Sequence, residues 1–169
     1  MMPTQLARSI WVICNLNKMR PASSWIGCIG NFPPSVFTET AGVQSHCGEN
    51  YALQIQHGNG ESVTLNRDAQ GQIRAGKGDP DWAGYAARID LSSGSPSVLL
   101  TCDPFGLHGI FTAQVGETFW FASDINLLRQ AAQIPNTLNL VALHGYLCFG
   151  YVPTPTTLYN GISTLPAGS

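Results

Sequence analysis

The hydrophobic pattern of the first half of the chain favours short strands separated by turns. Residues 51–56 alternate apolar and polar positions, which is typical of a strand with one buried face. Asn59 and Gly60 mark a tight turn, so residues 62–66 are expected to return as the second strand of a hairpin. Further strands are predicted where apolar runs lie between breaks: residues 25–32, 82–90, 98–102, 111–113 and 118–122. Residues 67–81 are polar and glycine-rich, which predicts a loop.

The pattern becomes helical after the last of these strands. Ser123 can cap a helix over residues 124–133, because a serine oxygen accepts hydrogen bonds from the free N–H groups of a first turn. Asn139 can cap a second helix over residues 140–148, and Gly150 can end it. Strands followed by helices predict an α+β fold rather than an alternating parallel sheet.

The composition limits the kinds of partner. A chain of 169 residues suits one domain. Eight Lys and Arg against ten Asp and Glu give a formal net charge of −2, so there is no basic surplus to hold a nucleic acid. No apolar run approaches the roughly 20 residues that cross a bilayer, and no export signal is readable. We therefore expect a cytoplasmic protein that binds neither nucleic acid nor membrane.

The cysteines are five in number and do not follow the spacing of a disulfide framework or of a structural zinc site. They are Cys14, Cys28, Cys47, Cys102 and Cys148. The number is odd and no pair has C-x-x-C spacing, so we expect reduced thiols and no metal site.

The second half contains several short motifs in a fixed order. A strand runs into a D-x-x-G turn at residues 103–106, and F-A-S-D-I follows at residues 121–125. Three further motifs follow: F-G-Y-V-P (149–153), T-L-Y-N-G-I (157–162) and L-P-A-G (165–168). Together they resemble the asparagine synthetase family, over roughly half of the chain. Residues 82–90 resemble a further strand of that family, with Gly84 and Asp90 in register.

This resemblance implies an N-terminal class II glutamine amidotransferase domain. Its fold would be an Ntn-hydrolase-like four-layer αββα sandwich of two antiparallel sheets, here shortened. In the family an N-terminal cysteine attacks the glutamine side-chain amide and releases ammonia. A C-terminal synthetase domain then uses ATP and Mg²⁺ to join that ammonia to a carboxylate. The resemblance implies no cofactor in this chain and a synthetase domain as partner in cis or in trans, and it allows a homodimer.

The expected organisation follows from the same comparison. Residues 1–24 are interpreted as an irregular leader and residues 25–150 as the amidotransferase-like domain. Residues 151–169 contain four prolines and are interpreted as a connector toward a missing synthetase domain.

The nucleophile of the family lies at the head of a C-G-I-x-G-x-F segment. Gly27, Gly30 and Phe32 match that segment, which puts Ile26 at the nucleophile position. Ile26 has no nucleophilic atom, so Cys28 is the remaining catalytic candidate, although it lies about 7 Å further along the strand. The family also uses the free α-amine of its nucleophile as the base, whereas residues precede both positions here. The sequence therefore predicts that glutaminase activity is lost.

Two turns hold the other candidate residues. Asn59, Gly60 and Glu61 match the start of the family's glutamine-binding N-G-E-I-Y-N turn, although Asn-Gly-Glu is also an ordinary hairpin turn. Asp103 and Gly106 are interpreted as structural, because Asp caps such a turn and Gly permits its backbone angles.

Two functions remain open. The chain can be a domain of an asparagine-synthetase-like ligase without its own glutaminase, as in β-lactam synthetase and the cyclases of lasso-peptide pathways. Alternatively, it is a stand-alone pseudo-amidotransferase that acts as a binding module. The S-G-G-x-D-S signature of the synthetase domain does not occur in these residues.

Overall fold

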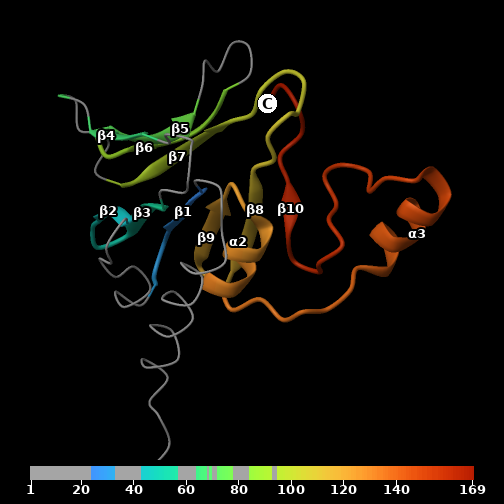
Figure 1. Cartoon of the computed structure of the whole chain (residues 1–169). Helices are drawn as coiled ribbons and strands as arrows, with labels where there is room; N and C mark the ends of the chain where they lie inside the picture. The colour runs from blue at the N-terminus through green and yellow to red at the C-terminus, as the bar shows by residue number, and fades with distance from the viewer. Residues whose placement is uncertain are drawn as a thin grey trace, which may run out of the picture.

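The described residues fold into two antiparallel sheets and two helices; Figure 1 shows their arrangement in the computed structural model. The structure describes residues 24–32, 43–56, 64–67, 69, 72–77, 84–92 and 95–169. The larger sheet has the strand order β10-β8-β9-β1-β3-β2. The smaller sheet has the order β4-β5-β6-β7. This arrangement confirms the predicted α+β class with two antiparallel sheets, in a shortened sandwich.

The bounds of the elements are these. The six-stranded sheet contains β1 (Ser24–Ile29), β2 (Val43–Cys47), β3 (Tyr51–Gln56), β8 (Phe111–Val115), β9 (Thr118–Ala122) and β10 (Ser163–Thr164). The four-stranded sheet contains β4 (Thr64–Arg67), β5 (Ile73–Lys77), β6 (Tyr85–Asp90) and β7 (Ser97–Thr101). The helices are α2 (Ile125–Ala131) and α3 (Leu140–Phe149).

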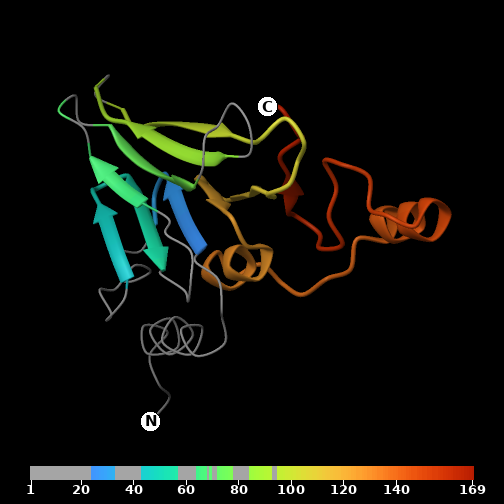
Figure 2. The same ribbon diagram turned by 45° about the horizontal axis from the view of Figure 1, so that its top comes forward.

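Two apolar cores lie on opposite faces of the six-stranded sheet. The sheets stack face to face (Figure 2), and Trp25, Leu53 and Phe121 fill the space between them. On the other face, Cys28 and Trp120 belong to the core that α2 covers with Leu128. Successive side chains of a strand point to opposite faces, so β1 supplies residues to both cores.

The first helix begins one residue later than predicted. Asp124, not Ser123, is the N-cap of α2, and its carboxylate accepts hydrogen bonds from the backbone N–H groups of Asn126 and Leu127. Ser123 instead extends the pairing of β9 with β1. Its Oγ accepts a hydrogen bond from the backbone N–H of Trp25 at 3.0 Å, and its own N–H donates to the Trp25 carbonyl at 3.0 Å.

The predicted hairpin between residues 51–56 and 62–66 is wrong. β3 pairs with β1 and β2, whereas β4 pairs with β5 in the other sheet. The predicted loop over residues 67–81 is also wrong, because it contains β5. Ile73 and Ala75 are fully buried and Arg74 between them is exposed, so β5 is a half-buried strand in a polar stretch. The Asn-Gly turn itself lies outside the described residues.

Other predicted elements are confirmed. β3 has the predicted bounds, and β8 and β9 form a hairpin around Gly116, whose φ is +59°. Asn139 is the N-cap of α3, and Gly150 ends it in the left-handed conformation.

A long arm carries α3 away from the sheets, as Figures 1 and 2 both show. Two antiparallel segments form the arm. The Asn139 N–H donates to the Leu158 carbonyl at 2.9 Å, and the Asn160 N–H donates to the Thr137 carbonyl at 3.0 Å. Leu138 and Tyr159 form an isolated bridge between these segments. The position of α3 is therefore set by backbone hydrogen bonds of the arm.

After the arm, the chain returns to the six-stranded sheet. β10 pairs with β8, and the Leu165 N–H donates to the Ile110 carbonyl at 2.8 Å. The Cys102 N–H then donates to the carbonyl of Ser169 at 2.8 Å. Part of the predicted connector, residues 151–169, thus forms an edge of the sheet. The expected leader over residues 1–24 lies outside the described residues except for Ser24, which begins β1.

Neither of the two described helices is long and apolar enough to cross a membrane.

Gly27 of β1 lies where the structure leaves no room for a side chain. A Cβ at this position would lie 2.5 Å from Cε2 of Phe121 and 2.9 Å from the carbonyl oxygen of Ala52. We expect Gly27→Ala to lower the free energy of unfolding by about 1–3 kcal/mol, because the core between the sheets is overpacked. Urea unfolding measures the difference.

Gly116→Asn is the matched control for this substitution. Gly116 has nothing within 4 Å of its virtual Cβ, and Asn adopts the left-handed conformation more readily than other residues. We expect this variant to unfold close to the unmodified chain. An equal loss of unfolding free energy in both variants would mean that the contact with Phe121 does not restrict the side chain at position 27.

Candidate functional site

The strand that carries the predicted nucleophile position is the centre of the larger sheet. β1 lies between β3 and β9, so both of its edges are hydrogen-bonded. Ile26 pairs with Gln54 on one side and Ala122 on the other, and its side chain is buried. The position that the sequence resemblance predicts for the nucleophile is therefore filled by a core side chain.

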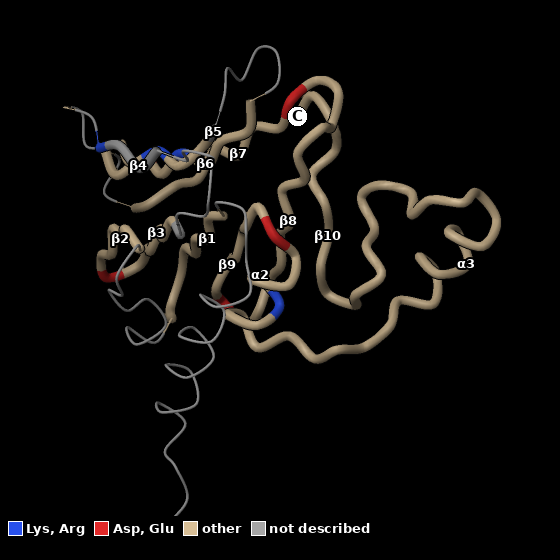
Figure 3. Tube along the Cα trace, viewed as in Figure 1, with Lys and Arg blue, Asp and Glu red and all other residues tan. Residues whose placement is uncertain are grey.

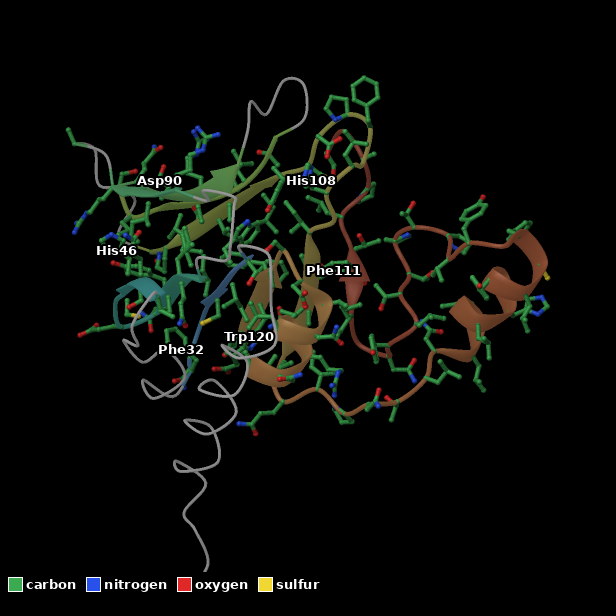
Figure 4. All side chains as sticks on the ribbon, in the orientation of Figure 1. Phe32, His46, Asp90, His108, Phe111 and Trp120 are labelled. Atoms are coloured by element: carbon green, nitrogen blue, oxygen red, sulfur yellow. The ribbon has the colours of Figure 1, made fainter. Side chains whose placement is uncertain are left out.

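Cys28 lies on the same face of β1 as Ile26, toward α2. It pairs with Ala52 of β3 and Trp120 of β9, and its side chain is fully buried. Figure 4 shows Trp120 beside α2 on this face. Burial raises the pKa of the Cys28 thiol, and the nearby Cys47 raises it further. Because the thiolate is the nucleophilic form, this environment suits a structural thiol better than a reactive one.

The predicted glutamine-binding residues Asn59, Gly60 and Glu61 lie outside the described residues. Their assignment stays a prediction.

The D-x-x-G turn is organised by a buried carboxylate. Oδ1 of Asp103 accepts hydrogen bonds from the backbone N–H groups of Phe105 and Leu107, each at 3.0 Å. Oδ2 accepts from the N–H of His108 at 3.1 Å. Gly106 has a φ of +64°, in the left-handed region that favours glycine. One side chain thus binds the backbone of three of the five residues that follow it.

These hydrogen bonds determine the protonation of Asp103. The backbone N–H of Leu107, with those of His108 and Phe105, holds the pKa of the carboxyl below its usual value. The turn also holds the end of the described chain, because the Gly168 N–H donates to the Asp103 carbonyl at 3.0 Å.

His108 lies at the end of this turn, against the core between the sheets (Figure 4). Its ring stacks on Tyr85 of β6, with centroids 4.7 Å apart, and Tyr85 stacks on Trp25 at 5.9 Å. The His108 Nδ1 is 3.8 Å from Oδ2 of Asp103, which is too long for a hydrogen bond. The nearest thiol is Cys102, which donates to the His108 carbonyl at 3.2 Å, and burial raises its pKa.

A separate cavity lies between the sheet edge and the arm. Its volume is about 470 Å³. Its lining contains hydroxyl and amide side chains but no charged one: Thr112, Ala113, Gln114, Phe119, Asn139, Thr156, Gly161, Ile162 and Ser163. Such a lining can bind an uncharged polar molecule, but it offers neither a nucleophile with a base nor a metal-ligating set.

Sequence reasoning missed two features of the β1 region. It interpreted Ser123 as a helix cap, although this residue clamps Trp25 at the start of β1. It also did not find Trp25 as the largest buried residue of the core, whose indole Nε1 has no hydrogen-bond partner. The sequence signal for these hydrogen bonds between Ser123 and Trp25 was the F-A-S motif, because a serine directly after a central strand can bond to a neighbouring strand.

The described residues contain no group of three or more His, Cys, Asp or Glu side chains that could hold a metal ion within one copy. Their buried thiols, Cys28 and Cys102, both have raised pKa values. The described part of the site therefore has the form of a packed sandwich centre with an ordered turn at one end.

Comparison with protein families identifies the second half of the chain. Residues 87–169 match the family model of the glutamine amidotransferase domain. The match begins within β6 and includes the Asp103 turn, the β8–β9 hairpin, both described helices and β10. No curated protein and no solved structure matches the chain. The second half of the chain is thus similar to a glutamine amidotransferase domain.

Asp103 makes the stability of the fold depend on pH. Its pKa is lowered in the folded state, so its contribution is present above the unfolded value of about 3.9 and is lost as pH falls through the folded value. We expect Asp103→Asn to destabilise the protein most at neutral pH, and the difference to shrink progressively below about pH 4. Denaturant unfolding of both proteins at several pH values measures this. A difference that stayed constant with pH would show that the charge of Asp103 does not matter.

Proposed function

We propose that this chain is the N-terminal amidotransferase-like domain of an asparagine-synthetase-like, ATP-dependent amide-forming ligase, and that it has no glutaminase activity of its own. The observation that carries the proposal is Ile26, a buried core residue at the position of the family nucleophile. The match of residues 87–169 to the glutamine amidotransferase domain supports the family part of the proposal.

Cys28 does not replace the nucleophile in this proposal. Its thiol is fully buried, and its raised pKa keeps it protonated at neutral pH. Glutamine could reach Cys28 from solvent only if Trp120 or α2 moved, because both cover this face of β1. The base is also lacking in the uncleaved chain, since other residues precede Cys28 and leave it without a free α-amine.

The Asp103 turn is our proposed contact for the synthetase domain, in cis or in trans. Phe105 and Leu107 are 68% and 65% exposed, although both belong to a turn that Asp103 holds rigidly. Residues 165–168 pack beside the turn, and Ala167 lies next to Gly106. Two ordered apolar side chains in water are a suitable anchor for a partner surface. ATP and Mg²⁺ would bind in that partner, in the cytoplasmic location expected from the sequence.

The cavity beside the arm favours a second candidate function. A stand-alone pseudo-amidotransferase would bind an uncharged polar metabolite among side chains such as Thr112, Gln114 and Ser163. The volume of about 470 Å³ lies in the range of small-molecule sites. In this alternative the chain acts as a binding module and forms no amide bond.

A glutaminase assay tests the loss of activity. We expect the purified chain to release no ammonia from glutamine above the blank, because Ile26 has no nucleophilic atom. Cys28→Ser is the matched variant, and we expect it to give the same rate as the unmodified chain. Ammonia release that Cys28→Ser abolished would overturn the proposal and make Cys28 the nucleophile.

The genomic context distinguishes the two candidates. For the ligase domain we expect an S-G-G-x-D-S signature in the same reading frame or in a neighbouring gene. For the binding module we expect no such signature at either place, and saturable binding of a neutral metabolite that Gln114→Ala weakens. Finding neither signature nor binding would count against both.

A further inference from the structure

The helix α3 exposes an unusually apolar surface. Only Ala142 and Gly145 are buried, on the side where Gly145 meets Pro153 of the arm. Val141, Leu147 and Leu140 of the same helix are 76%, 74% and 71% exposed. Residues 130–169 contain no Asp, Glu, Lys or Arg, and Figure 3 shows α3 and its arm without a charged position. Such a surface is typical of one that is covered by a partner.

Two metal-ligating side chains lie in the middle of this surface. His144 and Cys148 are four residues apart, which places them on one face of the helix. Both are exposed, and the His144 Nε2 is 3.6 Å from the Cys148 Sγ. Positions 140, 141 and 147 surround them on the same helical stripe. The pair is therefore presented outward, with apolar side chains on either side.

The distance between these two atoms fits one metal ion. Zinc binds thiolate sulfur at about 2.3 Å and imidazole nitrogen at about 2.05 Å, usually with tetrahedral angles. Those values require a sulfur-to-nitrogen separation of about 3.6 Å, and the structure shows 3.6 Å. Two ligands of a tetrahedral site are thus already in place, without movement of the backbone.

One copy supplies only half of the ligands of a structural zinc site. Such sites take four protein ligands, and the described residues offer no third His, Cys, Asp or Glu near the pair. A two-fold axis through the stripe would supply the same two ligands again and complete a Cys₂His₂ set. We propose that a second copy of this chain packs its α3 antiparallel against the first, with one Zn²⁺ bound by His144 and Cys148 of both copies.

The metal is necessary because the apolar contact alone is too small. A helix of ten residues is only about 15 Å long. Its exposed face is therefore smaller than the area of about 800 Å² that each partner buries in a stable interface. Each Cys148 loses its thiol proton to solvent as its sulfur binds the metal, and the imidazoles bind in the neutral form. The two thiolates balance the charge of Zn²⁺, which suits an interface that contains no other charged side chain.

The proposal does not depend on the glutaminase question, because α3 lies at the far end of the arm from β1 in both ribbon views (Figures 1 and 2). The cysteine spacing alone did not reveal it, since the ligands are one Cys and one His on a helix.

The experiment is a zinc titration of the whole reduced chain, followed by light scattering and metal analysis. With EDTA we expect a monomer. With Zn²⁺ we expect the apparent mass to double, with about one zinc bound per two chains. His144→Ala and Cys148→Ser are expected to stay monomeric at the same zinc concentration, with unchanged circular dichroism because both side chains are exposed. Co²⁺ in place of Zn²⁺ should give the visible absorption of a tetrahedral thiolate site.

The matched control is the double variant His46→Ala with Cys47→Ser. It removes a His and a Cys that lie on β2, away from α3, and it should still dimerise with zinc. Three results would overturn the proposal. The first is a dimer that persists in EDTA. The second is a zinc-dependent dimer in the Cys148→Ser variant. The third is one zinc per chain without any change of mass. A dimer that only oxidant forms and only reductant dissolves would point to a disulfide instead.

Discussion

The burial of β1 on both of its faces is the constraint on which the rest of the structure depends. Trp25 fills the space between the sheets, and Ile26 and Cys28 fill the space under α2. Residues 26–29 of β1 are also paired on both edges, so neighbouring strands satisfy the backbone of this segment. The same burial disfavours charge, and this is why the Cys28 thiol has a raised pKa. The packing of β1 and the raised pKa of the Cys28 thiol therefore have one physical cause.

A second constraint acts at the Asp103 turn, where a buried charge is tolerated because the backbone solvates it. Three N–H groups donate to the carboxylate, and its own carbonyl accepts from Gly106 and Gly168. The turn therefore joins β7 to β8 and also fixes residues 165–169 after their excursion along the arm. This double role explains why one turn orders both the chain end that follows β10 and the exposed side chains of Phe105 and Leu107.

The sequence was sufficient where a signal was local and insufficient where partners were distant. The alternation of residues 51–56 and the Asn139 and Gly150 caps of α3 predict those elements correctly, because each signal lies within one turn or one strand. The pairing of β3 with β1 and β2 depends on side chains far apart in the chain, so the Asn-Gly turn suggested a hairpin that does not form. β5 was missed because only Ile73 and Ala75 carry its apolar face. At the site, the assignment of Ile26 to the nucleophile position from the pattern of glycines stays a prediction. The structure adds that the Cys28 side chain is fully buried.

The Asp103 turn and α3 expose apolar side chains at separate places in the molecule, and this allows both surfaces to be occupied at once. Phe105 and Leu107 are exposed on the Asp103 turn. The end of the chain lies at the top of Figure 1, whereas α3 lies beyond the arm on the right. A zinc ion held by two copies of α3 would thus leave the turn free for a synthetase domain. Because the arm is fixed by backbone hydrogen bonds such as that from Asn139 to Leu158, a second copy would be held at a distance from the sheets. Dimer formation and partner binding would then be independent, and a substitution at one surface would leave the other unchanged.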